Sequence, residues 1–74
     1  MSTTRTPEYR RFLQRLRAAR KEAGLTQALV AKRLGRPQSF VAKCESGERR
    51  VDAVELAAFA RAYRKPLSYF LEER

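Results

Sequence analysis

Glycine and proline residues divide this chain into short stretches, and within each stretch the apolar residues recur at helical spacing. Gly24, Gly35 and Gly47 each follow such a stretch, at points where a helix is expected to end. Pro7 and Pro37 stand where a helix is expected to begin, because proline fits the first helical turn. No stretch alternates apolar and polar residues as a half-buried strand would. The pattern therefore predicts an all-α fold of five short helices.

The first predicted helix starts at Pro7, with Thr6 as its N-cap, and ends at Gly24. Its apolar residues are three and four positions apart, which indicates one buried face. A basic amphipathic helix of this kind also suits a membrane surface. Packing in a core is the better interpretation, because the other predicted helices need a surface to pack on. The apolar face consists of Tyr9, Phe12, Leu13, Leu16 and Ala19.

Four more helices are predicted along the rest of the chain. Thr26 is the expected N-cap of the second helix, whose buried residues are Val30, Ala31 and Leu34. The fourth helix begins at Asp52 with a capping box, and it ends before a proline that cannot continue it. The second helix is expected at 27–34, the third from residue 37 to about 46, and the fourth from residue 52 to before Pro66. The fifth is expected at 67–71, and its apolar residues are Leu67, Phe70 and Leu71.

The chain is strongly basic, since seventeen Lys and Arg against eight Asp and Glu give a net charge of +9. This excess is uneven, with +5 in residues 1–24, +4 in residues 25–50 and none in residues 51–74. Such a charge attracts polyanions, of which nucleic acid is the first candidate and an anionic membrane or an acidic protein the second. We expect one basic face and a neutral C-terminal end.

Cys44 is the single cysteine and the chain has no histidine, which excludes an internal disulfide and argues against a zinc site. We interpret Cys44 as a small buried hydrophobe rather than a redox sensor. A free thiol, with no signal peptide or transmembrane run, predicts a cytoplasmic protein. Neither a G-x-S-x-G motif nor a glycine-rich phosphate loop is present, so we expect no enzyme, no cofactor and no small-molecule ligand.

The second and third predicted helices are joined by a turn of about four residues around Gly35, which is typical of a helix-turn-helix. On the third helix, Val41 and Cys44 point to one side. The opposite side carries Gln38, Ser39 and Lys43, whose amide, hydroxyl and ammonium groups suit the reading of base edges. An ordinary solvated helix face is the alternative for these residues.

Residues 25–35, LTQALVAKRLG, followed by RPQSFVAKCESGERR, strongly resemble the phage-repressor helix-turn-helix family, of the Cro-like or xenobiotic-response-element (XRE) type. The resemblance covers about residues 13 to 71. It implies a five-helix lambda-repressor-like domain, here residues 6–74, with the helix-turn-helix at 26–47 and a flexible arm at residues 1–5. The motifs that carry it are GLTQ, Ala31, Gly35, Gln38-Ser39, Val41 and Glu45-x-Gly47.

The family resemblance also implies roles for single residues. Gln38, Ser39 and Lys43 match the positions that enter the DNA major groove. Arg20 and Glu45 match a structural ion pair that joins the first helix to the recognition helix. Expected contacts with backbone phosphates involve Gln27, Arg36, Arg49 and Arg50, although solvated charge remains an alternative for Arg49 and Arg50.

The implied function is that of a sequence-specific transcriptional regulator, a repressor that binds a palindromic operator as a homodimer. The two recognition helices would then lie roughly 34 Å apart. The alternative is a protein-interaction module, an antitoxin or adaptor, that grips an acidic partner. Dimer contacts are expected in the neutral C-terminal third, at Tyr63, Leu67, Tyr69 and Phe70, with core filling as the competing role for some of them.

Three features depart from the family pattern, and the role of Phe40 stays open. One departure is Cys44, which stands where the family commonly has a larger aliphatic or aromatic residue. Leu29 is apolar where the family usually has an exposed polar residue, which indicates a contact patch. Phe40 either packs at the rim of the core, the preferred interpretation, or contacts a thymine methyl group. Arg64, Lys65 and Pro66 replace the glycine that often ends the fourth helix, so the path of the chain after this helix is open.

Overall fold

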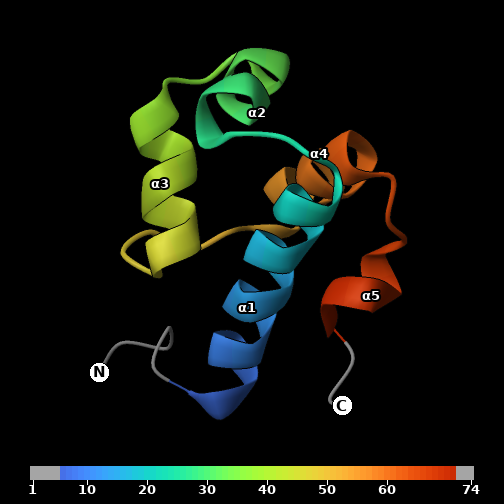
Figure 1. Cartoon of the computed structure of the whole chain (residues 1–74). Coiled ribbons are helices and arrows are strands. Elements are labelled where there is room, and N and C mark those ends of the chain that lie inside the picture. The colour runs from blue at the N-terminus through green and yellow to red at the C-terminus, as the bar shows by residue number, and fades with distance from the viewer. Residues whose placement is uncertain (1–5, 72–74) are drawn as a thin grey trace.

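The computed structural model describes residues 6–71, and in this part of the chain every regular element is a helix (Figure 1). The all-α prediction is thereby confirmed. The predicted arm at residues 1–5 lies outside the described residues, as do residues 72–74. The helices are α1 (Pro7–Glu22), α2 (Gln27–Leu34), α3 (Gln38–Ser46), α4 (Ala53–Tyr63) and α5 (Leu67–Leu71).

The helix starts follow from side-chain caps that the sequence predicts. The Oγ1 atom of Thr6 accepts a hydrogen bond from the Tyr9 amide, at 3.1 Å, and Thr26 caps α2 in the same way. Asp52 and Glu55 form the capping box at the start of α4. Pro37 is a small correction: it is the N-cap of α3, with extended backbone, rather than a residue of the first turn.

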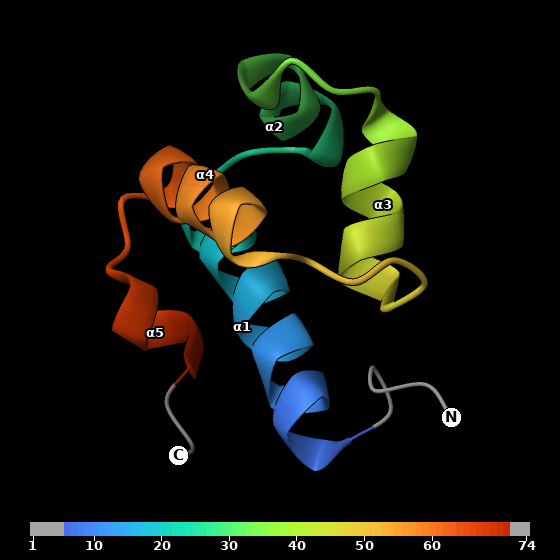
Figure 2. The same cartoon turned by 180° about the vertical axis from the view of Figure 1, so that it is seen from behind.

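The helices surround a single core, with α1 in the middle of the arrangement. Helices α3 and α5 both pack on α1, whereas α2 packs on α3 and on α4 (Figures 1 and 2). Apolar residues of all five helices meet in this core, which confirms core packing for the apolar face of α1. Leu34 is only half-buried, so the expected burial of α2 holds for Val30 and Ala31 alone. The largest fully buried side chains are Leu16, Val30, Val41, Cys44, Phe59 and Phe70.

The burial of three aromatic residues bears on the predicted dimer contacts and on the role of Phe40. Tyr63 is 4% exposed and Phe70 is 1% exposed, so neither can form a surface for a second subunit as predicted. Helix α5 is only five residues long and packs on both α1 and α4, so the rings of Tyr63 and Phe70 are used to fill the core at this end of the domain. Phe40 is also buried, with its ring parallel to that of Phe59 at a centroid distance of 6.2 Å. It therefore belongs to the core and not to the surface that would meet DNA.

Helices α2, α3 and α4 all end at a residue with left-handed backbone conformation. Gly35 ends α2 with φ of 67°, a conformation that glycine adopts without strain. Arg64 ends α4 with φ of 57° and ψ of 44°, and it is the one residue other than glycine with positive φ between residues 6 and 71. This geometry settles how the chain leaves α4 without the glycine that the sequence lacks.

None of the helices within residues 6–71 combines the length and the apolar character that crossing a bilayer requires.

Candidate nucleic-acid interface

The turn between α2 and α3 spans three residues and is fixed by backbone hydrogen bonds. The amide of Arg36 donates to the carbonyl of Ala31 at 2.9 Å, while the amide of Gly35 donates to that of Lys32 at 3.2 Å. The left-handed Gly35 redirects the chain, and Pro37 then starts α3 without giving up an amide that the helix needs. Together α2, this turn and α3 form the predicted helix-turn-helix.

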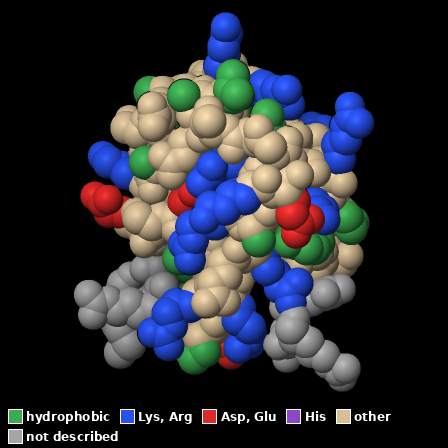
Figure 3. All heavy atoms as spheres, viewed as in Figure 1, with side chains coloured by type: hydrophobic (Ala, Val, Ile, Leu, Met, Phe, Trp, Pro, Cys, Tyr) green, Lys and Arg blue, Asp and Glu red, His purple; other side chains and the backbone are tan. Residues whose placement is uncertain are grey.

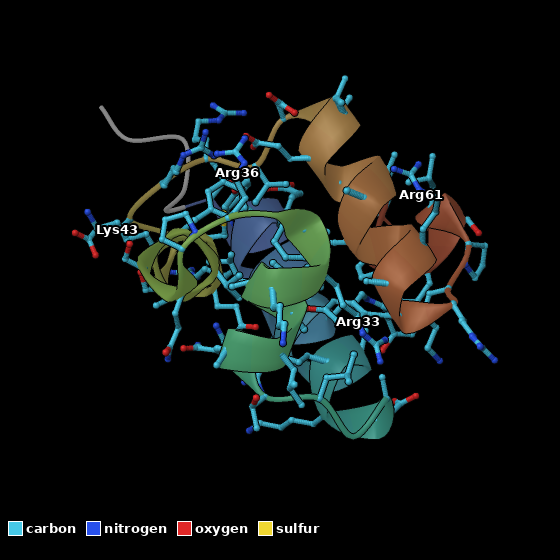
Figure 4. All side chains as sticks on the ribbon, turned by 90° about the horizontal axis from the view of Figure 1, so that it is seen from above. Arg33, Arg36, Lys43 and Arg61 are labelled. Atoms are coloured by element: carbon cyan, nitrogen blue, oxygen red, sulfur yellow. The ribbon has the colours of Figure 1, made fainter. Side chains whose placement is uncertain are left out.

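Helix α3 has one buried face and one exposed face. Phe40, Val41 and Cys44 are buried against the domain. Gln38, Ser39 and Lys43 are exposed, and their side chains make no hydrogen bond or ion pair with the residues from 6 to 71. In Figure 4, α3 is viewed end-on, down its axis. Lys43 extends outward from it, away from the other helices. The three predicted base-reading residues thus share one exposed face of α3.

Glu45 holds α3 to the rest of the domain from the buried side. Its carboxylate, in a residue only 3% exposed, accepts hydrogen bonds from the Nε of Arg20 at 2.7 Å and from its Nη2 at 3.2 Å. Its backbone carbonyl accepts a further bond from the Nη1 of Arg17, at 2.7 Å. The bond to Glu45 raises the pKa of the Arg20 guanidinium above its ordinary value, although burial of the group acts in the opposite direction.

Gln27, at the start of α2, belongs to the same network. Its Nε2 donates to the Oε1 of Glu45 at 3.0 Å, so a residue expected at a phosphate also has an intramolecular partner. A side-chain amide carries two N–H donors, and only one of them is used by this bond. Glu45 therefore connects the N-terminal residue of α2 with α1 and α3.

A second network, which the sequence did not reveal, surrounds Phe40. The Arg49 guanidinium binds the Glu55 carboxylate through two hydrogen bonds, both of 2.8 Å. Arg36 lies 3.6 Å from the same carboxylate. Both guanidinium groups also stack on the Phe40 ring, at 4.3 Å for Arg36 and 4.7 Å for Arg49. Glu55 was recognisable from its spacing only as a helix cap.

This second network has clear electrostatic consequences. The hydrogen bonds from Arg49 lower the pKa of the Glu55 carboxyl, against the opposing effect of its burial. The same bonds raise the pKa of the Arg49 guanidinium. Since Glu55 also accepts from the Asp52 amide, one carboxylate caps α4 and orients two arginines. We name Arg36, Phe40, Arg49 and Glu55 the arginine cluster.

The fourth predicted phosphate contact, Arg50, lies in the loop after α3, where it is exposed. Its guanidinium is 5.8 Å from the centroid of the Tyr9 ring, so this residue joins the loop to α1. The Tyr9 hydroxyl in turn accepts a hydrogen bond from the Val51 amide. The guanidinium groups of Arg36 and Arg49 thus lie together over Phe40, whereas that of Arg50 lies near Tyr9.

Cys44 is completely buried on the inner face of α3. This burial raises the pKa of its thiol above the ordinary value, although the nearby Arg49 acts in the opposite direction. The burial agrees with the interpretation of Cys44 as a small apolar residue. Leu29, in contrast, is exposed on α2.

In the view of Figure 3, Lys and Arg side chains cover more of the surface than Asp and Glu side chains do. Several acidic groups are already engaged by arginine or lysine, as in the Glu45 and Glu55 networks and the pair of Lys65 with Glu22. The positive charge that is left favours a polyanion as partner.

A family model and a solved structure both place this chain in the same family. A family model described as a helix-turn-helix domain matches residues 11–67. A solved structure of an XRE-family like protein from Pseudomonas syringae pv. tomato str. DC3000 is 45% identical, with a TM-score of 0.81. The similarity covers 86% of this chain and 78% of that one. No curated protein matched. The chain belongs to the helix-turn-helix family, XRE or Cro-like in type, whose fold is that of a DNA-binding regulator.

Proposed function

We propose that this protein is a sequence-specific transcriptional repressor that places α3 in the major groove of DNA. One observation carries the proposal. Gln38, Ser39 and Lys43 are exposed together on one face of α3, while the buried Glu45 ties this helix to α1. A helix held in this way presents its polar groups in a defined orientation, as base reading requires.

The chemistry of the exposed face suits direct readout. The amide of Gln38 can donate to and accept from the N7 and N6 edge of adenine, and the ammonium group of Lys43 can donate to O6 and N7 of guanine. Ser39 can donate or accept. A solvated face would need no such combination of groups at the N-terminal end of α3, where helix-turn-helix proteins contact bases.

The arginine cluster supports a role in contacting the DNA backbone. Arg36 and Arg49 come from the two ends of α3, from the turn before it and the loop after it. Stacking on Phe40 and pairing with Glu55 restrict both side chains before DNA arrives, which lowers the entropy that binding must remove. Gln27 and Arg50 complete the proposed phosphate contacts, Gln27 through its second N–H donor.

We further propose that the repressor binds as a homodimer to a palindromic operator. Burial removes Tyr63 and Phe70 from the expected interface, but Leu67 and Leu71 of α5 remain 49% and 63% exposed. Tyr69 is half-buried beneath Arg15 and Lys65. An apolar surface around Leu67 and Leu71 is therefore the proposed contact between two copies.

Selection of bound sequences from a random pool of duplex DNA tests this function directly. The expected outcome is a palindromic consensus whose half-sites are one helical turn apart, since two copies of α3 must enter successive major grooves. A selection that yields no consensus would contradict sequence-specific binding. Binding to an acidic protein with no DNA enrichment would favour the interaction-module alternative.

A further inference from the structure

A cleft of about 310 Å³ lies between the α1–α2 turn and the C-terminal end of α4. Its volume is at the lower end of the range for small-molecule sites. It is lined by Ala23, Leu25, Arg33, Ala62, Tyr63 and Arg64.

The charge in this cleft is positive and uncompensated. Arg33 of α2 and Arg64 at the end of α4 both line it, whereas no carboxylate does. Within residues 6–71 neither arginine has a hydrogen-bond or ion-pair partner for its side chain. The neighbouring Lys65, in contrast, is bound to Glu22 at 2.9 Å. Two like charges at one cleft disfavour each other unless an anion lies between them.

The backbone of Arg64 gives an independent reason to assign it a role. A left-handed conformation costs an L-residue other than glycine free energy, and glycine is the residue that usually ends a helix in this way. Within residues 6–71 the arginine side chain makes no hydrogen bond, ion pair or ring contact that would offset this cost. The fold needs the left-handed conformation to end α4, but glycine would adopt it at lower cost, so an arginine at this position is a candidate functional side chain.

The cleft is separate from the recognition surface. Figure 4 shows Lys43 extending outward from α3, whereas Arg33 lies on the other side of α2, between α2 and α4. DNA bound along the exposed face of α3 would therefore leave this cleft open. Its volume admits a small molecule that carries an anionic group, but not a helix or an extended peptide.

We infer that Arg33 and Arg64 form a binding site for a small oxyanion ligand, such as inorganic phosphate or the phosphate group of a small molecule. The two guanidinium groups would donate paired hydrogen bonds to its oxygens. Because Arg33 belongs to α2 and Arg64 ends α4, the bound anion would fasten the helix-turn-helix to α4. The inference does not depend on the proposed DNA function.

Thermal unfolding in inorganic phosphate, compared with sodium chloride at equal ionic strength, tests the site. Phosphate should raise the melting temperature of the unmodified protein in a saturable way, as a ligand of the native state does. Arg33→Gln should abolish this saturable rise. Arg64→Gly should also abolish it, yet raise the phosphate-free melting temperature by about 2–5 °C, because glycine adopts the left-handed conformation without strain.

Arg61→Gln is the matched control, since Arg61 is exposed on α4 and does not line the cleft. This variant should keep the saturable effect of phosphate. General stabilisation by phosphate as an excluded salt does not saturate and would be equal in all variants. The inference is overturned if phosphate acts no more strongly than chloride, if Arg64→Gly keeps the full effect, or if Arg61→Gln loses it.

Discussion

Arg20 of α1 and Glu45 of α3 are joined by two hydrogen bonds, from Nε to Oε2 at 2.7 Å and from Nη2 to Oε1 at 3.2 Å. The geometry is bidentate and the carboxylate is almost fully buried. Gln27 donates to the same carboxylate, so the pair fixes both helices of the helix-turn-helix. The orientation of the exposed face of α3 depends on this buried ion pair.

Arg20→Ala should lower the free energy of unfolding by about 3–5 kcal/mol, because it leaves the Glu45 carboxylate buried without its charged partner. Denaturant unfolding measures the change. Arg10→Ala is the control, since Arg10 is exposed on the same helix, and it should change stability by less than about 0.5 kcal/mol. A loss below about 1 kcal/mol for Arg20→Ala would mean that the pair behaves like an exposed one.

Glu55→Gln should make the stability of the protein less dependent on pH in acid. Arg49 lowers the pKa of the Glu55 carboxyl in the folded state. The stabilisation by the Arg49–Glu55 pair is therefore fully present above the ordinary glutamate pKa of about 4.3. It disappears as the pH falls through the lower pKa that Glu55 has in the folded protein. Glutamine keeps the capping role but does not titrate in this range.

The measurement is the difference in unfolding free energy between the unmodified protein and Glu55→Gln, taken at pH 7 and at several values below pH 4. The unmodified protein should be the more stable at pH 7, and this advantage should shrink steadily toward low pH. All other titrating groups are common to both proteins, so they cancel in the difference. An advantage that stays constant over this range would show that the Arg49–Glu55 pair contributes nothing through its charge.

Cys44 should react with thiol reagents only when the protein unfolds. Its side chain is buried, and burial raises the pKa of the thiol, so both access and the thiolate fraction are low. Because it is the only cysteine, the labelling signal reports this one site. Labelling in native buffer should be slow and should increase with denaturant along the unfolding curve. Rapid native labelling would instead favour a redox-sensing role.

The local parts of the fold could be predicted because their causes lie within a few residues. Thr6, Thr26 and Asp52 accept hydrogen bonds from amides three positions along the chain, so spacing alone reveals these helix starts. The buried face of α3 follows equally from helical periodicity. The expected positions of helices α1 to α5 therefore agree with the structure to within a residue or two.

Features that depend on distant packing were not predictable in the same way. The apolar character of Tyr63 and Phe70 fits both a core and an interface, and only the position of the short α5 decides for the core. The spacing of Glu55 from Asp52 predicts only a helix cap. Its ion pairs with Arg36 and Arg49 depend on how the loop after α3 folds back onto α4. The left-handed Arg64 contradicts the usual preference for glycine, so its local sequence gives no warning of it.

Binding to DNA should weaken strongly as salt concentration rises. About six phosphate contacts in a dimer predict a slope near −5 in a plot of log affinity against log salt concentration, because each contact releases counterions. Fluorescence anisotropy with a labelled operator at several potassium chloride concentrations gives this slope. A flat response would remove DNA as the polyanionic partner.

The central claim, that α3 reads base edges, is tested most directly by Lys43→Ala. Its affinity should be measured for the selected operator and for a panel of operators that each carry one substituted base pair. If Lys43 pairs with a guanine, the variant should lose about 1–3 kcal/mol of binding free energy on the operator and lose discrimination at that one position. Lys32→Ala, on the exposed side of α2, is a charge-matched control and should keep full discrimination. Equal weakening of Lys43→Ala on every operator, or no change on any of them, would contradict base reading by Lys43.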